Sequence, residues 1–311
     1  MNSVSKKLVR FAALSLAAFR SPAERLRVER RHRGWEQYKQ LEKADRVVVS
    51  FGKSGRTWLR MMISRFYQVR YGLSSHSLIG FDNLHKKNPA IPTILFTHDT
   101  FLKDYTGNLD KSDYRSKRVV LLVRNPADTA VSQYHQWAHR MKDHKKVLND
   151  FPAADEDVTL FDFVMGDRGG MPRNIEFLNS WAAALPSLSD VHVVRYEDLR
   201  ANPQETLAAL LEFMGTPGSD AEVEEAVEYS AFENMRKMES KRTFWPSGGR
   251  MVPKDRNNVN SYKVRRGEVG GYRGDFTPVE VEAVDAYLRE HLSPVYGYGA
   301  DGQPAVEEVS A

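Results

Sequence analysis

From residue 46 onward the chain alternates between two patterns of apolar and polar residues. Short runs rich in valine, leucine and isoleucine have the length and composition of strands buried on both faces. These runs are Arg46–Phe51, Thr93–Thr97, Arg118–Val123 and Val191–Arg195. Longer stretches with helical spacing of apolar residues are the segment after Gly55, Ala127–Met141, Pro203–Met214 and Pro278–Leu292. Strands that alternate with helices predict an α/β fold with a central parallel sheet flanked by helices.

The same patterns divide the chain into three parts. We expect residues 44–298 to form one α/β domain, preceded by a basic segment, 1–43, and followed by a flexible tail, 299–311. Within the domain, the polar stretches His139–Asp157 and Lys241–Tyr262 are too long to be simple connections. We expect these two stretches to frame a substrate pocket.

Charge separates the N-terminal segment from the body of the protein. The formal net charge is +4, but residues 1–43 contain 11 Lys and Arg against 4 Asp and Glu, which leaves −3 for the rest. A body this close to neutral is not expected to bind nucleic acid. The stretch Leu8–Phe19 would form a helix with one apolar face beside basic residues. Residues 5–33 are therefore a candidate for peripheral membrane contact, with packing on the domain as the alternative.

The composition excludes several classes of protein. The chain has no cysteine, which excludes a disulfide scaffold, a thiolate-bound zinc and a cysteine nucleophile. No apolar run reaches the roughly 20 residues that span a bilayer. Arg10 interrupts the first apolar stretch and no small-residue cleavage site follows it, which argues against a cleavable signal. We expect a cytoplasmic protein, held at the inner membrane face if the basic segment binds lipid.

The strongest local signal is the loop after the first predicted strand, Ser50-Phe-Gly-Lys-Ser-Gly-Arg-Thr-Trp58. A strand that runs through a glycine-rich turn into a helix gathers backbone N–H groups and a helix N-terminus around one point, where an anion is stabilised. The loop is P-loop-like in layout, but its lysine precedes the second glycine, unlike the lysine of nucleotide triphosphatases. Its candidate binding residues are Lys53, Ser54, Gly55, Arg56, Thr57 and Trp58.

A second anion site is predicted where the third strand ends. Arg124 follows this strand directly, and Pro126 then begins a helix. A guanidinium at this place would repel a metal ion but would bind a phosphate through two hydrogen bonds. Ser132, further along the helix, is placed to contact the same phosphate. Two anion sites without a metal site predict a ligand with phosphates at two separated positions.

Five segments resemble those of the sulfotransferases that use 3′-phosphoadenosine 5′-phosphosulfate (PAPS). Lys53–Trp58 is similar to the family's 5′-phosphosulfate loop, P-K-S-G-T-T-W, and Arg124–Ser132 is similar to its 3′-phosphate motif. Val193–Leu199 and Tyr229–Met235 resemble the segments beside the adenine. Arg265–Arg273 resembles the late motif R-K-G-x-x-G-D-W-K. The five motifs occur in family order over about residues 46–292.

The resemblance implies PAPS as the sulfuryl donor, adenosine 3′,5′-bisphosphate (PAP) as the product, and no metal. It assigns Lys53, Arg56 and Thr57 to the 5′-phosphosulfate, with Lys53 also stabilising the departing oxygen as a catalytic residue. The residues implied at the 3′-phosphate and the adenine are Arg124, Ser132, Tyr196, Phe232, Arg265, Arg266 and Gly267.

The family's catalytic base is a histidine in a K-T-H sequence after a short strand. In Thr93-Ile-Leu-Phe-Thr-His-Asp99, His98 stands at that place. An acceptor hydroxyl has to lose its proton as its oxygen attacks sulfur, and an imidazole titrates near neutral pH. His98 is therefore the predicted general base for an in-line transfer to a hydroxyl or an amine.

The sequence departs from the family pattern at four positions. Gly52 stands where the loop usually has a proline, and Arg266 stands where the late motif has a lysine. Phe96 replaces the lysine two residues before the histidine, so that one basic contact is either missing or supplied by Arg56. Pro278 replaces a valine of the family's dimer motif, which leaves the oligomeric state open.

The sequence does not identify the acceptor, and a small phenol or alcohol, a lipid headgroup and a glycan all stay open. Two other functions also stay open: a non-catalytic module that binds PAP or an anionic surface, and a metal-dependent nucleotide kinase. Arg124 argues against the kinase, because a kinase would hold Mg²⁺ near such a strand end through an acidic residue.

Overall fold

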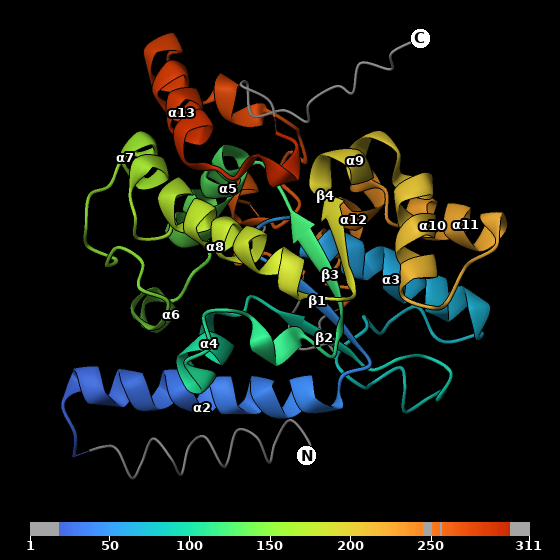
Figure 1. Ribbon diagram of the computed structural model, residues 1–311. Coiled ribbons are helices and arrows are strands. Elements are labelled where there is room, and N and C mark those ends of the chain that lie inside the picture. Colours follow the sequence, from blue (N-terminus) through green and yellow to red (C-terminus); the bar gives the residue numbers. More distant parts are fainter. Residues whose placement is uncertain (1–18, 245–250, 256, 299–311) are drawn as a thin grey trace.

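A four-stranded parallel sheet lies at the centre of the protein (Figure 1). The structure, a computed structural model, describes residues 19–244, 251–255 and 257–298. The strands are β1 (Arg46–Ser50), β2 (Ile94–Thr97), β3 (Arg118–Val123) and β4 (Val191–Arg195), in the order β2-β1-β3-β4. The predicted α/β fold is confirmed. Strand β2 lies on one side of β1, whereas β3 and then β4 lie on the other side of β1. The carboxyl ends of β1 and β3 therefore border the crevice in which such sheets bind ligands.

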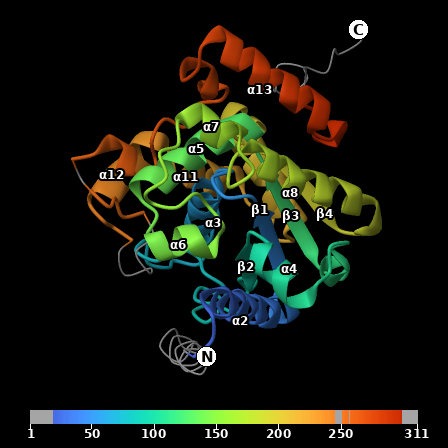
Figure 2. The ribbon, with the colours of Figure 1, turned by 90° about the vertical axis from the view of Figure 1, so that its left-hand side faces the viewer.

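Helices cover both faces of this sheet (Figures 1 and 2). The helices are α2 (Pro22–Lys43), α3 (Arg56–Arg70), α4 (Thr100–Thr106), α5 (Pro126–His139), α6 (Asp143–Leu148), α7 (Leu160–Met165), α8 (Met171–Ala184), α9 (Tyr196–Ala201), α10 (Pro203–Phe213), α11 (Asp220–Tyr229), α12 (Phe232–Ser240) and α13 (Pro278–His291). The predicted strands and long helices are found within a few residues of their expected ends. The polar stretch His139–Asp157, predicted to be more than a simple connection, contains α6.

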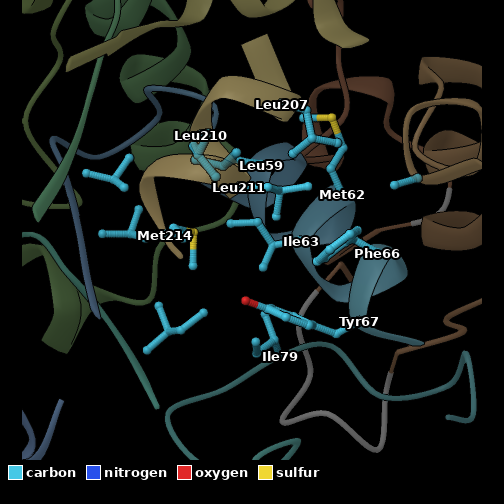
Figure 3. Close-up of a cluster of buried hydrophobic side chains, with 14 of the residues drawn as sticks. Leu59, Met62, Ile63, Phe66, Tyr67, Ile79, Leu207, Leu210, Leu211 and Met214 are labelled. Carbon is cyan, nitrogen blue, oxygen red and sulfur yellow. The ribbon is translucent and has the colours of Figure 1, made fainter. Parts of the chain in front are cut away.

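Alternate side chains of the strands enter two different cores. Val48 of β1 packs into a cluster with α3 and α10, whereas its neighbours Val47 and Val49 pack on the opposite face with Trp181 of α8. Figure 3 shows the first cluster, in which side chains of α3 and α10 meet. Burial on both faces explains why the strands are continuous apolar runs rather than alternating ones. These two cores hold the ends of β1 and β3 in place.

The described part of the basic N-terminal segment packs on the domain. Helix α2 lies along α4 at one edge of the molecule (Figure 1), where Arg30 forms an ion pair of 2.8 Å with Asp104. Leu41, near the end of α2, is 2% exposed in the core beneath the sheet. The predicted amphipathic stretch Leu8–Phe19 lies outside the described residues, apart from Phe19. No helix in residues 19–244, 251–255 and 257–298 is long and apolar enough to cross a membrane.

A substitution at Gly34 tests how closely α2 packs against α4. A Cβ atom at this position would lie 2.0 Å from the carbonyl oxygen of Phe101 and 2.5 Å from the Cβ of Tyr105, both in α4. In an exposed helix, Gly→Ala stabilises by about 1 kcal/mol. Here we expect Gly34→Ala to lower the free energy of unfolding by about 1–3 kcal/mol, because the backbones have to separate. Urea unfolding measures the change, and a stabilised variant would show that α2 is not docked on α4.

Candidate active site

A cavity of about 490 Å³ opens at the carboxyl ends of β1 and β3. Its wall brings together segments that are far apart in the sequence. The predicted site residues in this wall are Lys53, Gly55, Arg56, Thr57, Trp58, His98, Arg124, Ser132, Tyr196, Phe232, Arg265, Arg266 and Gly267. Ser54, the remaining one, is 2% exposed and does not line the cavity. The five sequence motifs therefore converge on one site.

Two residues in the loop between β1 and α3 have a left-handed backbone conformation. Lys53 has a φ of 74° and Gly55 a φ of 90°. Gly55 is required for a second reason, because a Cβ there would lie 2.4 Å from Cδ2 of Tyr196. The loop thus brings its backbone and the N-terminus of α3 against the aromatic wall of the cavity. A helix N-terminus of this kind stabilises an anion through its free N–H groups.

Tyr196, at the start of α9, connects the separate parts of the site. Its ring meets Trp58 edge-on, with 5.8 Å between ring centroids, and its hydroxyl donates to the carbonyl of Gly267 at 3.3 Å. The guanidinium of Arg124 lies over the same ring, 4.3 Å from its centroid. Phe232 packs against Gly267 on the other side. Together the rings form an apolar patch between the loop of Lys53 and the segment around Gly267.

Arg124 is fixed at the end of β3 by backbone groups. Its Nη1 donates to the carbonyl of Lys53 at 3.3 Å and its Nη2 to the carbonyl of Glu268 at 3.0 Å. Its Nε is buried without a hydrogen-bond partner in the described part of the chain. Asp128 forms an ion pair of 3.7 Å with Arg124. Its carboxylate also accepts from the backbone N–H groups of Gly270 and Tyr272. Asp128 therefore holds the late glycine-rich motif against α5, with the Arg124 guanidinium at the cavity wall.

The two arginines of the late motif differ in how much of their charge is available. Arg266 forms an ion pair of 2.9 Å with Asp275, so its charge is partly compensated within the chain. Arg265 is half-buried, and burial together with the neighbouring Arg266 lowers its pKa. Gly267, next to them, has a φ of 70°, which turns the backbone past Phe232. Arg265 forms no ion pair with any described residue, so more of its charge than that of Arg266 is available at the wall.

His98 follows β2 and points its ring into the cavity wall. Its Nδ1–H donates to the carbonyl of Ser50 at 2.7 Å, and its Nε2 accepts from Nη2 of Arg56 at 2.5 Å. Burial and the positive charge of Arg56 lower the pKa of His98 to about 3. The imidazole is therefore neutral at pH 7, and the Ser50 bond places its lone pair on Nε2. That lone pair faces Arg56 and the cavity.

A buried ion pair supports the backbone beside this histidine. Asp99, the next residue, has a φ of 62° and is 4% exposed. Its carboxylate accepts from Nζ of Lys111 at 2.8 Å and from the hydroxyl of Tyr114 at 2.7 Å. Its own N–H donates to Oγ1 of Thr97 at 2.9 Å. These contacts hold the turn that carries His98.

Lys53 is the central cation of the site. Its ammonium makes no hydrogen bond or ion pair with any residue that the structure describes. Burial, followed by the nearby charge of Lys263, lowers the pKa of Lys53 to about 7. An anionic ligand beside a lysine that is buried near other positive charges stabilises the charged form of that lysine.

Sequence reasoning missed three residues at this site. Lys263 lines the cavity, and Glu239 and Arg140 hold its segment from behind. Lys263 stands two residues before Arg265 and directly after Lys241–Tyr262, one of the two stretches predicted to frame the pocket. Arg140 lies within the other stretch, His139–Asp157. Glu239 gave no signal, because nothing in the sequence predicts which distant backbone groups a carboxylate will contact.

The neutrality of His98 can be tested directly by nitrogen-detected NMR. We expect the wild-type imidazole to titrate far below 6.5 and to carry its proton on Nδ1 at pH 7. Arg56→Met removes the nearest positive charge, so the pKa of His98 rises, while burial still keeps it below 6.5. The exposed Arg25→Met is the control and leaves it unchanged. A wild-type His98 that is protonated at pH 7 would contradict this assignment.

Known proteins share both the sequence pattern and the fold. Cytosolic sulfotransferase 13 of Arabidopsis thaliana is 28% identical over 269 residues, which cover 81% of this chain and 78% of that protein. A flavonol sulfotransferase-like protein of Flaveria bidentis is 29% identical over 273 residues, with 81% and 82% covered.

Two solved structures have a similar fold. A mouse sulfotransferase in complex with PAP matches with a TM-score of 0.52 at 21% identity, covering 80% of this chain and 84% of that one. A retinol dehydratase in complex with androsterone and PAP matches with a TM-score of 0.54 at 16% identity, covering 83% and 84%. The sulfotransferase domain family matches residues 43–295. Because this match spans most of the chain, the protein belongs to the sulfotransferase family.

Proposed function

We propose that this protein transfers a sulfuryl group from PAPS to a hydroxyl or an amine and releases PAP. The observation that carries the proposal is the arrangement of two cationic sites at one crevice, on either side of an aromatic patch. PAP matches that arrangement. Its 3′- and 5′-phosphates would occupy the two cationic sites, and its adenine would lie against the aromatic patch between them. Membership in the family and the PAP complexes of two structures with this fold support the same donor.

The 5′ end of the donor fits the loop after β1. The N–H groups at the start of α3 and the Lys53 ammonium would bind the 5′-phosphosulfate, with Thr57 as a further donor. Gly52, where the family pattern has proline, leaves the N–H donors of the loop available. The 3′-phosphate fits Arg124, Ser132 and Arg265, which line the other side of the cavity.

The adenine fits the aromatic patch between these two sites. Trp58, Tyr196 and Phe232 come from three different elements and meet beside Gly267. The Trp58 indole is fixed by its Nε1–H, which donates to the carbonyl of Ser230 at 2.9 Å. Rings that are held in this way present a flat apolar surface at little entropic cost.

His98 is placed to act as the general base. The acceptor oxygen would attack sulfur while its proton passes to Nε2 of His98. The bond between sulfur and the bridging oxygen then breaks, and its electron pair stays on the 5′-phosphate of PAP. Lys53 and the N–H groups of the loop stabilise that developing charge. Because Arg56 donates to Nε2 of His98, the acceptor hydroxyl has to displace this guanidinium.

The acceptor would contact lining residues of the cavity that have no role in binding the donor. These include Gln37 of α2, Phe101 of α4, Gln133 of α5 and Phe151. Such a mixture of amides and rings suits a small molecule that carries both a hydroxyl and an apolar body. A lipid or glycan acceptor, and membrane contact through residues 5–33, have no support in the described contacts. The cytosolic relatives support a cytoplasmic location.

Calorimetry with PAP in EDTA tests the donor site. We expect wild-type protein to bind PAP at micromolar concentration without metal. Lys53→Ala and Arg124→Ala should each weaken binding by more than about tenfold, because each removes a charge-assisted contact to a phosphate. The exposed Lys43→Ala is the matched control. Binding only with Mg²⁺ would instead favour a nucleotide kinase.

Turnover separates an enzyme from a PAP-binding module. With 4-nitrophenol, or with the first acceptor that a PAPS screen yields, we expect His98→Ala to lower kcat by about 10²–10⁴. Its PAP affinity should change by less than about threefold, since the role of His98 is proton transfer. The exposed His144→Ala serves as the control. Full activity of His98→Ala would overturn the assignment of the base, and PAP binding with no turnover on any acceptor would favour the module.

A further inference from the structure

Position 96, where the family pattern has a lysine, carries no charge in this protein. Phe96 of β2 pairs with Val48 of β1, and the guanidinium of Arg60 lies 3.9 Å from the centroid of its ring. Arg60 is itself 9% exposed, on the buried side of α3. Phe96 and Arg60 therefore form a packed pair behind the cavity wall, and neither is among the residues that line the cavity.

Lys263, which comes much later in the sequence than Phe96, lines the cavity that contains Lys53 and His98. It lies between the 3₁₀ turn Val259–Ser261 and the late motif that begins at Arg265. Among the described residues, no hydrogen bond or ion pair holds its ammonium group. Its side chain is partly exposed to the cavity. A lysine in this position is available to an anionic ligand.

The backbone of Lys263 is fixed by a buried carboxylate. Glu239 of α12 is 0% exposed, and its two oxygens accept from the N–H groups of Lys263 at 2.8 Å and Val264 at 3.0 Å. Arg140, just after α5, pairs with the same carboxylate at 3.3 Å and also donates to the carbonyl of Ser261. A buried carboxylate with these partners holds the segment rigidly and directs one side chain into the cavity.

The charge of Lys263 acts on the residues of the reaction centre. It is the leading charged influence that lowers the pKa of Lys53, and it also contributes to the lowered pKa of His98. Burial, followed by the charges of Arg140, Arg56 and Arg60, lowers the pKa of Lys263 to about 8. Lys263 therefore lies near the group that would bind the 5′-phosphate and near the base that would face the acceptor.

We propose that Lys263 binds the oxygen atoms of the transferring sulfuryl group and so replaces the cation that Phe96 does not provide. This inference rests on the proposed function, because the sulfuryl group is present in PAPS and absent from PAP. The fixed backbone of Lys263 holds its side chain in the cavity that Lys53 and His98 also line. Negative charge on the sulfuryl oxygens during transfer is stabilised there without a metal.

The test compares the affinities of PAPS and PAP by calorimetry, which needs no acceptor. We expect Lys263→Met to weaken PAPS binding by about tenfold or more, while PAP binding changes by less than about threefold. Lys263→Arg keeps the charge and should retain PAPS affinity within about threefold of wild type. The exposed Lys237→Met, on α12, is the matched control. Thermal unfolding of each variant shows whether the fold is intact.

Equal losses of PAP and PAPS affinity in Lys263→Met would mean that Lys263 only supports the neighbouring Arg265, and would overturn the inference. Unchanged affinity for both ligands would overturn it too. A wild-type protein that binds neither ligand would overturn the proposed function, and the inference with it.

Discussion

The structure depends on keeping several positive side chains close together where little water reaches them. Lys53, Arg56 and Lys263 share one cavity wall, and their charges repel one another more strongly there than in water. The pKa of Lys53 falls to about 7 and that of Lys263 to about 8 as a result of burial and of this repulsion. An anionic ligand between these side chains reduces the repulsion, and this favours its binding.

Buried carboxylates hold this arrangement together mainly through the backbone. Asp128 accepts from Gly270 and Tyr272, and Glu239 accepts from Lys263 and Val264. Glu197, 4% exposed, accepts from the N–H of Asn125, beside the end of β3. Each carboxylate fixes a segment that carries a cation without covering the side of the cation that faces the cavity. The same positive surroundings keep His98 neutral, so that its lone pair is available to accept a proton.

Much of the fold and of the site could be predicted, because the signals were local. A run such as Arg118–Val123 forms a strand through its own side chains, and the arginine and proline that follow mark its end. The loop at Lys53 was recognisable for the same reason. By contrast, the docking of α2 on α4 through Gly34 has no local signal, since a glycine within a helix has many uses.

The sequence by itself determined the parallel α/β fold and the family to which the chain belongs, and it placed the two segments that we propose bind the phosphates of the donor. Each of these follows from residues that are neighbours along the chain. The tertiary structure decided that Arg56 donates to Nε2 of His98, that the Arg60 guanidinium lies over the ring of Phe96, and that Lys263 lines the cavity. These contacts join residues that are distant in sequence, and their electrostatic effects depend on distance and burial. These distances and this burial are set only when the helices pack on the sheet.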